Sequence, residues 1–574
     1  MSHYFKSINV FIFPFIILVL LSCNKELERV DILNQGTTKT SYSYSKSRNP
    51  YSLSVMQVAL ETLLATKTES VDPITLEPTD YYIRVNPLDT MAIKNLQEMD
   101  IEVFDYPLDI ELEDDLEICH SPSSTEEAQS IWYYASVAPN LAVEEVPYEL
   151  VLEAMNNNDT LRVELINDNN QVVPCELLDE CFVPDHYIAT KSGKNLPVSA
   201  EELESMAFKI AGITLNDSDT KASSVNPSGH IYFMNGSETV GLSGVKIRAQ
   251  KWFTVETTHT GTNGSFSIGK KFKKPNISII YSNRHGFSIW GNWAFICPAT
   301  FTQASVSNAS NFKKYFSRSS HYSAWSWSVV NNAAYDYYLD CSSGLLARVS
   351  KPPKNLKIWC FNMDIGFGGG APMIKHLVTS RVLSGTTALA SYLASLGWFS
   401  IVPIAVASLV NIMGPDILIK TKNESHDNLY ATTWHELSHA SHFSSIGEWN
   451  YGKMIWYEMT HGDTNHLYGV GGTGSDGEGW CELSEAYAFS IENYVLKRRL
   501  CYPSPLEGTS AYYFFNKYTR TLTGLLNGYI VNPGEVFCCM TKETTNMRSL
   551  LTLMCTKFQY KEGLIKKEMY NNGL

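Results

Sequence analysis

The sequence predicts a multidomain α+β protein, with a mixed N-terminal region, a small β-sandwich and then a mainly helical C-terminal domain. The chain of 574 residues is too long for one ordinary domain. Short alternating runs separated by Gly, Asn and Ser turns fill residues 226–298, as in a β-sandwich. Further on, helical character is strong at residues 431–443 and 477–499. We therefore place the accessory region at 50–221 and the C-terminal domain at 300–574.

The first residues predict export and lipid anchoring. Lys6 precedes an apolar run at 10–21, which is the pattern of a secretory signal peptide. Leu20-Leu21-Ser22-Cys23 then resembles a bacterial lipobox, whose cysteine takes diacylglycerol. We expect residues 1–22 to be the signal peptide and residues 23–49 to be a lipidated, polar tether. An ordinary transmembrane anchor is the alternative, although the apolar run is short.

The residues after Cys23 favour the outer membrane. Asn24 stands where lipoproteins retained in the inner membrane usually carry Asp. Residues 25–28, Lys-Glu-Leu-Glu, resemble the acidic surface-export signals of some Gram-negative lipoproteins. We therefore expect a protein of the cell envelope that is anchored to the outer membrane and exposed at the surface.

Charge and cysteine usage exclude some classes of partner and site. The formal net charge of −14 disfavours nucleic acid as a partner. Removing Cys23 from the 12 cysteines leaves an odd number with no regular framework, and Cys175 with Cys181 is the most plausible local bridge. No CxxC pair exists, so a zinc site built from thiolates is disfavoured.

Local patterns predict several individual elements. Residues 52–65 space their apolar side chains as an amphipathic helix does, and residues 80–87 form a short strand that ends at a proline. The glycine-rich stretch GFGGGAPM, residues 366–373, lacks the Lys-Ser/Thr of a P-loop and is interpreted as a flexible loop. The apolar residues 386–413 are interrupted by glycine and proline, so we expect buried helices there and not a membrane span.

The order of motifs in residues 226–298 resembles the carboxypeptidase-regulatory, transthyretin-like domain. The matching features are Gly229 at the first strand, residues 242–247 (LSGVKI), the Thr pair at 257–258 and Asn263-Gly264-Ser265-Phe266. The resemblance implies that Asn-Gly makes a tight turn and that Phe266 packs in the core. Such domains are usually structural additions to secreted enzymes and transport proteins.

The strongest chemical signal is His435-Glu436-Leu437-Ser438-His439, an HExxH pattern. Side chains four residues apart lie on one face of a helix, so two imidazoles there can hold one Zn²⁺. Glu436 is then placed to accept a proton from water at the metal. A chance match in a chain with 14 histidines is expected at the level of roughly a few per cent.

The third histidine of this stretch is a poor candidate ligand. His442 lies about 300° round the helix from His439, so it borders the ligand face without continuing it. The metzincin spacing would require a histidine at position 445, which is Ser445. A metzincin is therefore excluded, and the third ligand must come from elsewhere.

The helix predicted at residues 477–499 offers that ligand. Glu478, Glu482 and Glu485 share one face in a stretch rich in apolar side chains, and a buried carboxylate needs a metal or a base as partner. The run SEAYAF, residues 484–489, resembles the Asn-Glu-Gly-Phe-Ala motif of gluzincin aminopeptidases, in which glutamate is the third zinc ligand. Glu485 matches that glutamate, while Glu478 and Glu482 remain alternatives because their spacing resembles that of thermolysin-like enzymes.

The gluzincin resemblance covers the two helices and implies a zinc metallopeptidase. It assigns zinc to His435, His439 and Glu485, and the role of general base to Glu436. Gluzincins usually stabilise the oxyanion with Tyr or His, so Tyr468, His461 and His466 are candidates. In these enzymes an edge strand before the metal helix aligns the peptide, which would here be residues 415–420.

Two further interpretations remain open from the sequence. In one, the chain is a non-catalytic surface lipoprotein that binds a host or envelope ligand, and its HExxH is structural or degenerate. In the other, the zinc chemistry is kept but the substrate is a glycan-linked or cell-wall amide. Bound zinc separates the first of these from a zinc-dependent peptidase acting on peptide or protein substrates.

Overall fold

A computed structural model describes most of the chain after residue 48. The described residues are 49–67, 73–85, 96, 99, 101–104, 106–110, 112, 116–118, 132–139, 142–143, 161–166, 172–190, 196–213, 224–291, 297–362, 368–379, 414–461, 476–502 and 517–574. The expected signal peptide, the lipidation site Cys23 and the apolar stretch 386–413 lie outside them. Within the described residues, no helix is both long and apolar enough to cross a membrane.

The described chain has the α+β architecture that the sequence predicts. An antiparallel sheet in the N-terminal region has the strand order β3-β1-β6-β5-β4. Its strands are β1 (Asp80–Val85), β3 (Tyr133–Val137), β4 (Ala142–Val143), β5 (Leu161–Ile166) and β6 (Val172–Cys181). Helices α2 (Leu53–Ala65) and α7 (Ala200–Ile210) share a buried apolar cluster with residues of this sheet, and α6 (Pro184–Thr190) follows β6. The predicted helix at 52–65 is confirmed, and the predicted strand at 80–87 is confirmed over residues 80–85, its last two positions lying outside the described residues.

A large mixed sheet carries the strands that lead to the candidate site. Its main path is β10-β9-β12-β13-β16-β18-β17, while β14 pairs with β12 and β2. The strands are β2 (Leu116–Ile118), β9 (Val245–Lys251), β10 (Thr254–His259), β12 (Asn276–Asn283), β13 (Phe287–Gly291), β14 (Thr300–Gln303), β16 (Leu356–Phe361), β17 (Gly369–Gly370) and β18 (Ile417–Lys420). Parallel pairing of β13 with β16 and of β16 with β18 joins residues before and after position 300 in one sheet.

Two expectations about the edge of this sheet are corrected. The stretch predicted as a flexible loop contains β17, which pairs antiparallel with β18 through Gly369–Ile419 and Gly370–Leu418. The strand predicted at 415–420 exists as β18, but β17 covers it, so the outermost strand of this path is β17. The pairing joins segments almost fifty residues apart, which local sequence patterns cannot reveal.

The remaining strands form a small sheet that carries Gly229 and Phe266 of the transthyretin-like resemblance, whereas residues 245–247 and the Thr pair at 257–258 lie on β9 and β10 of the large sheet. It contains β7 (Ser228–Asn235), β8 (Glu238–Gly241), β11 (Ser265–Ser267) and β15 (Phe312–Phe316). Gly264 turns the chain into β11 with φ +79°, and Asn263 Oδ1 accepts from the backbone N–H of Ser265. Phe266 is buried in the core. The implied Asn-Gly turn and the buried phenylalanine are therefore both present.

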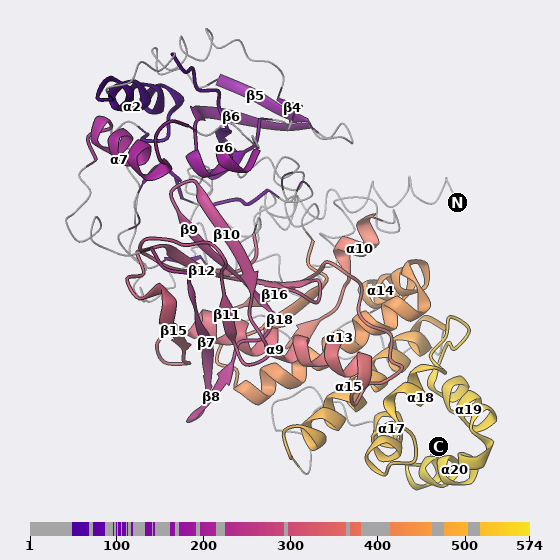
Figure 1. The fold of residues 1–574 in the computed structure, drawn as a ribbon. Coiled ribbons are helices and arrows are strands. Elements are labelled where there is room, and N and C mark those ends of the chain that lie inside the picture. The colour runs from indigo at the N-terminus through magenta and orange to yellow at the C-terminus, as the bar shows by residue number, and fades with distance from the viewer. Residues whose placement is uncertain are drawn as a thin grey trace, which may run out of the picture. The chain divides into compact units, whose positions relative to one another are not determined.

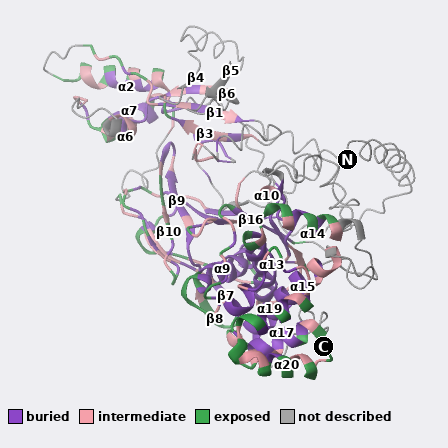
Figure 2. Ribbon diagram, turned by 90° about the vertical axis from the view of Figure 1, so that its right-hand side faces the viewer, coloured by how far each residue is buried: buried purple, intermediate pink, exposed green. Residues whose placement is uncertain are grey.

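The C-terminal region is helical (Figure 1). Its helices are α9 (Tyr322–Ser343), α10 (Ile374–Thr379), α13 (His426–Ile446), α14 (Glu448–His461), α15 (Asp476–Arg498), α17 (Lys517–Asn527), α18 (Pro533–Phe537), α19 (Met547–Lys557) and α20 (Glu562–Asn571). Helix α13 packs between α9 and α15, and α17 packs on α15. Figure 2 shows α9 and α13 as largely buried and α20 as largely exposed. The helix with the HExxH pattern therefore lies at the centre of this region.

The predicted bridge between Cys175 and Cys181 is wrong. The two cysteines form no disulfide with each other, and both are buried. They stand on the same strand, β6, six residues apart, which corresponds to roughly 20 Å of extended chain. A disulfide requires Cα atoms within about 7 Å of one another, so this strand keeps the two thiols apart.

Candidate metal centre

Helix α13 presents the two histidines of the HExxH pattern from a buried position. Ser425 caps its first turn by accepting from the backbone N–H of Asn428, and Gly447 ends it with φ +79°. Every side chain from Leu429 to Phe443 is buried, so the polar residues of the pattern lie inside the protein. The helix predicted around His435 is therefore confirmed, and it is buried on all sides.

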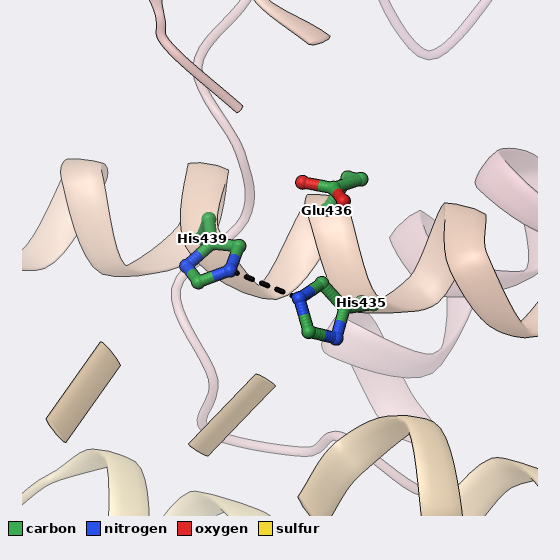
Figure 3. A group of neighbouring side chains, drawn as sticks. All are labelled: His435, Glu436 and His439. Carbon is green, nitrogen blue, oxygen red and sulfur yellow. Dashed lines mark hydrogen bonds between the residues drawn. The ribbon is translucent and has the colours of Figure 1, made fainter. Parts of the chain in front are cut away.

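The two imidazoles face each other across one helical turn (Figure 3). Nε2 of His435 lies 3.2 Å from Nε2 of His439. One ligand atom each from His435, Glu436 and His439 can be chosen so that all lie within 4.8 Å of one another. A buried group of this composition can hold a metal ion.

Helix α15 adds the carboxylate of Glu485 to this pair. Oε2 of Glu485 lies 3.5 Å from Nε2 of His435, and Oε1 lies 3.4 Å from Nε2 of His439. Helix α15 packs against α13, and the ring of Phe489 lies 4.4 Å from that of His435 between centroids.

The spacing of the donor atoms fits a metal ion held between the two imidazoles. Zinc bonds of about 2.0–2.1 Å at tetrahedral angles place neighbouring ligand atoms roughly 3.3–3.4 Å apart. The two Nε2 atoms are 3.2 Å apart, close to this spacing, and the Glu485 carboxylate faces the pair with both oxygens, one 3.5 Å from His435 and the other 3.4 Å from His439. Among the described residues, Oε2 of Glu485 and Oε2 of Glu436 are buried without a hydrogen-bond partner. Two orphaned carboxylate oxygens beside two imidazoles therefore fit a missing cation.

A second carboxylate of α15 orients one of the histidines. Nδ1 of His435 lies 3.1 Å from Oε2 of Glu492, whose side chain is fully buried. A ligand histidine usually donates its second ring N–H to such a group, which fixes the ring and its tautomer. The sequence prediction missed Glu492, although it lies seven residues after Glu485 and hence on the same face of the helix.

The protonation behaviour of the centre follows from its burial and charges. Burial disfavours the charged imidazole, yet hydrogen bonds to Glu485 and Glu492 raise the pKa of His435 well above its usual value. Burial would raise the pKa of Glu485, but the two imidazoles hold it at about 2. Burial, with Glu485 and Glu492 nearby, raises the pKa of Glu436 to about 8. Without a metal, protons therefore provide the positive charge that the carboxylates require.

Strand β17 comes into direct contact with the catalytic candidate Glu436. A Cβ atom added to Gly369 would lie 2.5 Å from Oε1 of Glu436 and 3.0 Å from Cγ2 of Thr432. Only glycine leaves room for the carboxylate in this position. The glycine stretch was predicted to be a loop. Through Gly369 it instead lines the site beside Glu436.

The other predicted residues fall outside the centre or outside the described residues. Burial and the charge of Glu478 raise the pKa of the Glu482 carboxyl although Lys517 lowers it, and within the described residues no hydrogen bond or ion pair joins this carboxyl to the two imidazoles. Tyr468 and His466 lie outside the described residues. His461 is the last residue of α14, and its side chain is outside the described set. The oxyanion-stabilising residue therefore stays a prediction.

No family model, no curated protein sequence and no solved structure matches this chain. Any function must therefore be argued from the site itself.

Proposed function

We propose that the protein is a zinc-dependent peptidase whose metal is held by His435, His439 and Glu485. The observation that carries this proposal is a pair of buried imidazole nitrogens 3.2 Å apart, faced by the two oxygens of Glu485 at 3.4 and 3.5 Å, with the unpartnered Oε2 of Glu436 beside them. Two neutral imidazoles and one carboxylate, with a position left open, form the usual ligand set of catalytic zinc. A zinc ion bound there would act as a Lewis acid toward a carbonyl group and would make water more acidic.

Side chains of the protein supply the other functions that hydrolysis requires. Glu436 accepts a proton from the attacking water on its free Oε2 and can return it to the leaving amine. Glu492 holds the ring of His435 through Nδ1, and burial of the whole group keeps competing water away. Because Glu436 is fixed in place by α13 and β17, its carboxylate needs little reorganisation to act.

The position of β17 favours an extended peptide as substrate. This strand ends the path of the large sheet and contacts Glu436 through Gly369. A peptide that pairs with its outer edge would add one more strand and would pass directly beside the general base. Backbone pairing of this kind suits a polypeptide better than a glycan-linked amide.

Metal removal tests the proposal. We expect purified protein to contain one zinc per chain by elemental analysis and to cleave a mixed peptide library. Treatment with 1,10-phenanthroline should reduce cleavage to background, and equimolar zinc should restore it, because the water-activating cation has been removed and returned. The non-chelating 1,7-isomer is the matched control. Absence of stoichiometric metal, or cleavage that survives chelation, would favour a non-catalytic binding protein instead.

We also propose that Cys23 carries the lipid that anchors the protein to the outer membrane. The basis is the lipobox-like sequence alone, because these residues lie outside the described part of the chain. In a Gram-negative host, wild-type protein should incorporate labelled fatty acid and sediment with outer membranes. Cys23→Ala should lose both, whereas Cys501→Ala, at an exposed free cysteine, should lose neither. Labelling that persists in Cys23→Ala would contradict this anchor.

A further inference from the structure

A further histidine of α13, His442, is connected to the metal centre through a hydroxyl group of α15. Oγ of Ser484 lies 2.9 Å from Nδ1 of His439 and 3.1 Å from Nδ1 of His442. All three side chains are buried. Ser484 therefore bridges a candidate ligand and a histidine for which the proposed chemistry has no role.

Counting protons fixes the direction of both hydrogen bonds. Among the described residues, the two ring nitrogens are the only partners of the Ser484 hydroxyl, so its single proton is donated to one of them and its oxygen accepts from the other. If Nε2 of His439 binds a cation, Nδ1 carries the ring proton and donates it to Oγ of Ser484. Ser484 must then donate to Nδ1 of His442, whose own ring proton is on Nε2.

We propose that His442 is a positioning residue, the buried acceptor that ends the chain His439–Ser484–His442 and so fixes the ring of His439 for metal binding. This inference rests on the proposed metal site. Burial next to His439 lowers the pKa of His442 to about 3, which keeps the ring neutral and able to accept. The arrangement orients a second ligand without another buried carboxylate.

The two ligand histidines are thus supported by different chemistry. His435 donates to the charged Glu492, whereas His439 donates to a neutral hydroxyl. The carboxyls of Glu436, Glu485 and Glu492 are buried around one cation site, and burial together with the charges of Glu485 and Glu436 raises the pKa of the nearby Glu458 to about 8. These carboxyls already outnumber the two charges of a divalent ion, so a neutral hydrogen-bond chain holds His439 at less cost than a further carboxylate would.

Zinc affinity, measured by competition with a chelating dye, tests the hydrogen-bond chain from His439 through Ser484 to His442. His442→Leu removes the terminal acceptor and should weaken binding by about tenfold, within the range typical for outer-shell partners. His442→Asn places an amide oxygen close to the position of Nδ1 and should restore affinity to nearly the wild-type value. Ser484→Ala should weaken binding by at least as much as His442→Leu. The double variant Ser484→Ala/His442→Leu should be no weaker than Ser484→Ala, because His442 acts only through Ser484.

Additive losses in the double variant, or an Asn variant as weak as the Leu variant, would show that His442 acts by packing and would overturn the proposal. Nitrogen-15 NMR of histidine-labelled, zinc-loaded wild type gives a check that needs no variant. The His442 signals should show an unprotonated Nδ1 and a protonated Nε2, and the opposite tautomer would overturn the proposal.

The outcomes separate this inference from the proposed function. A wild type that binds zinc with the expected coupling but cleaves no peptide would reject the peptidase and keep the role of His442. A protein that cleaves peptides but shows additive losses would reject only the role of His442. Wild type that binds no zinc would overturn both.

Discussion

Glu436→Gln is expected to lower kcat by about 10²–10⁴-fold while the bound metal stays at one ion per chain. Glutamine keeps the size and shape of the side chain but cannot take up the proton that peptide hydrolysis releases from water. The metal should remain because its proposed ligands are His435, His439 and Glu485, whose carboxylate oxygens already lie within 3.5 Å of the imidazole nitrogens. Steady-state kinetics and elemental analysis of the same sample measure both effects.

The matched control is a substitution at an acidic residue that has no role in the site. Glu448 is the first residue of α14 and is exposed, so Glu448→Gln should retain wild-type kcat and metal content. Full activity in Glu436→Gln would contradict the proposed mechanism. Loss of metal from that variant would instead indicate that Glu436 is a ligand. This outcome is worth measuring because a ligand atom of Glu436 lies within 4.8 Å of those of His435 and His439.

The parts of the site that could be predicted are those that depend on local spacing. An i, i+4 pair of histidines shares a helix face whatever surrounds it, so His435 and His439 followed from the sequence. The apolar neighbours on the next helix indicated that one of its glutamates is a ligand, because a buried carboxylate needs a partner, and the resemblance of SEAYAF to the gluzincin motif favoured Glu485. The structure places its oxygens within 3.5 Å of both imidazoles.

The parts that were missed depend on how distant segments pair. Glu492 and Ser484 contact the histidines only because α15 lies against α13 in one register, which helical periodicity does not specify. Gly369 contacts Glu436 because β17 pairs with β18, and nothing within the glycine stretch indicates that partner. In the same way, the parallel pairing of β13 with β16 joins segments that the sequence pattern had separated.

The charges of the centre give an independent reason to expect a cation. Three buried carboxylates surround two imidazoles. Besides burial, the groups that shift the pKa of Glu436 are His435 and the carboxyls of Glu485 and Glu492. An uncompensated buried charge is costly, so the metal-free protein must bind protons on this group. Metal binding would displace those protons and would therefore become tighter as the pH rises.

Gly369→Ala is expected to lower kcat by about a hundredfold with little effect on stability or on metal content. The new Cβ would lie 2.5 Å from Oε1 of Glu436, closer than any relaxed contact allows. The atom that must yield is the end of a flexible side chain, so the fold should tolerate the change while the general base is displaced. Kinetics, thermal unfolding and elemental analysis together distinguish this result from general damage.

A second substitution, at Glu436, tests whether Gly369→Ala acts through this carboxylate. Glu436→Asp shortens the side chain by one methylene and withdraws the carboxylate from the added methyl group. Gly369→Ala should therefore cost much less activity in the Glu436→Asp background than in wild type, as expected for two residues in contact. Gly269→Ala, whose new Cβ would meet no atom within 4 Å, is the control and should leave kcat unchanged. Equal losses from Gly369→Ala in both backgrounds would mean that β17 acts on the substrate and not on Glu436.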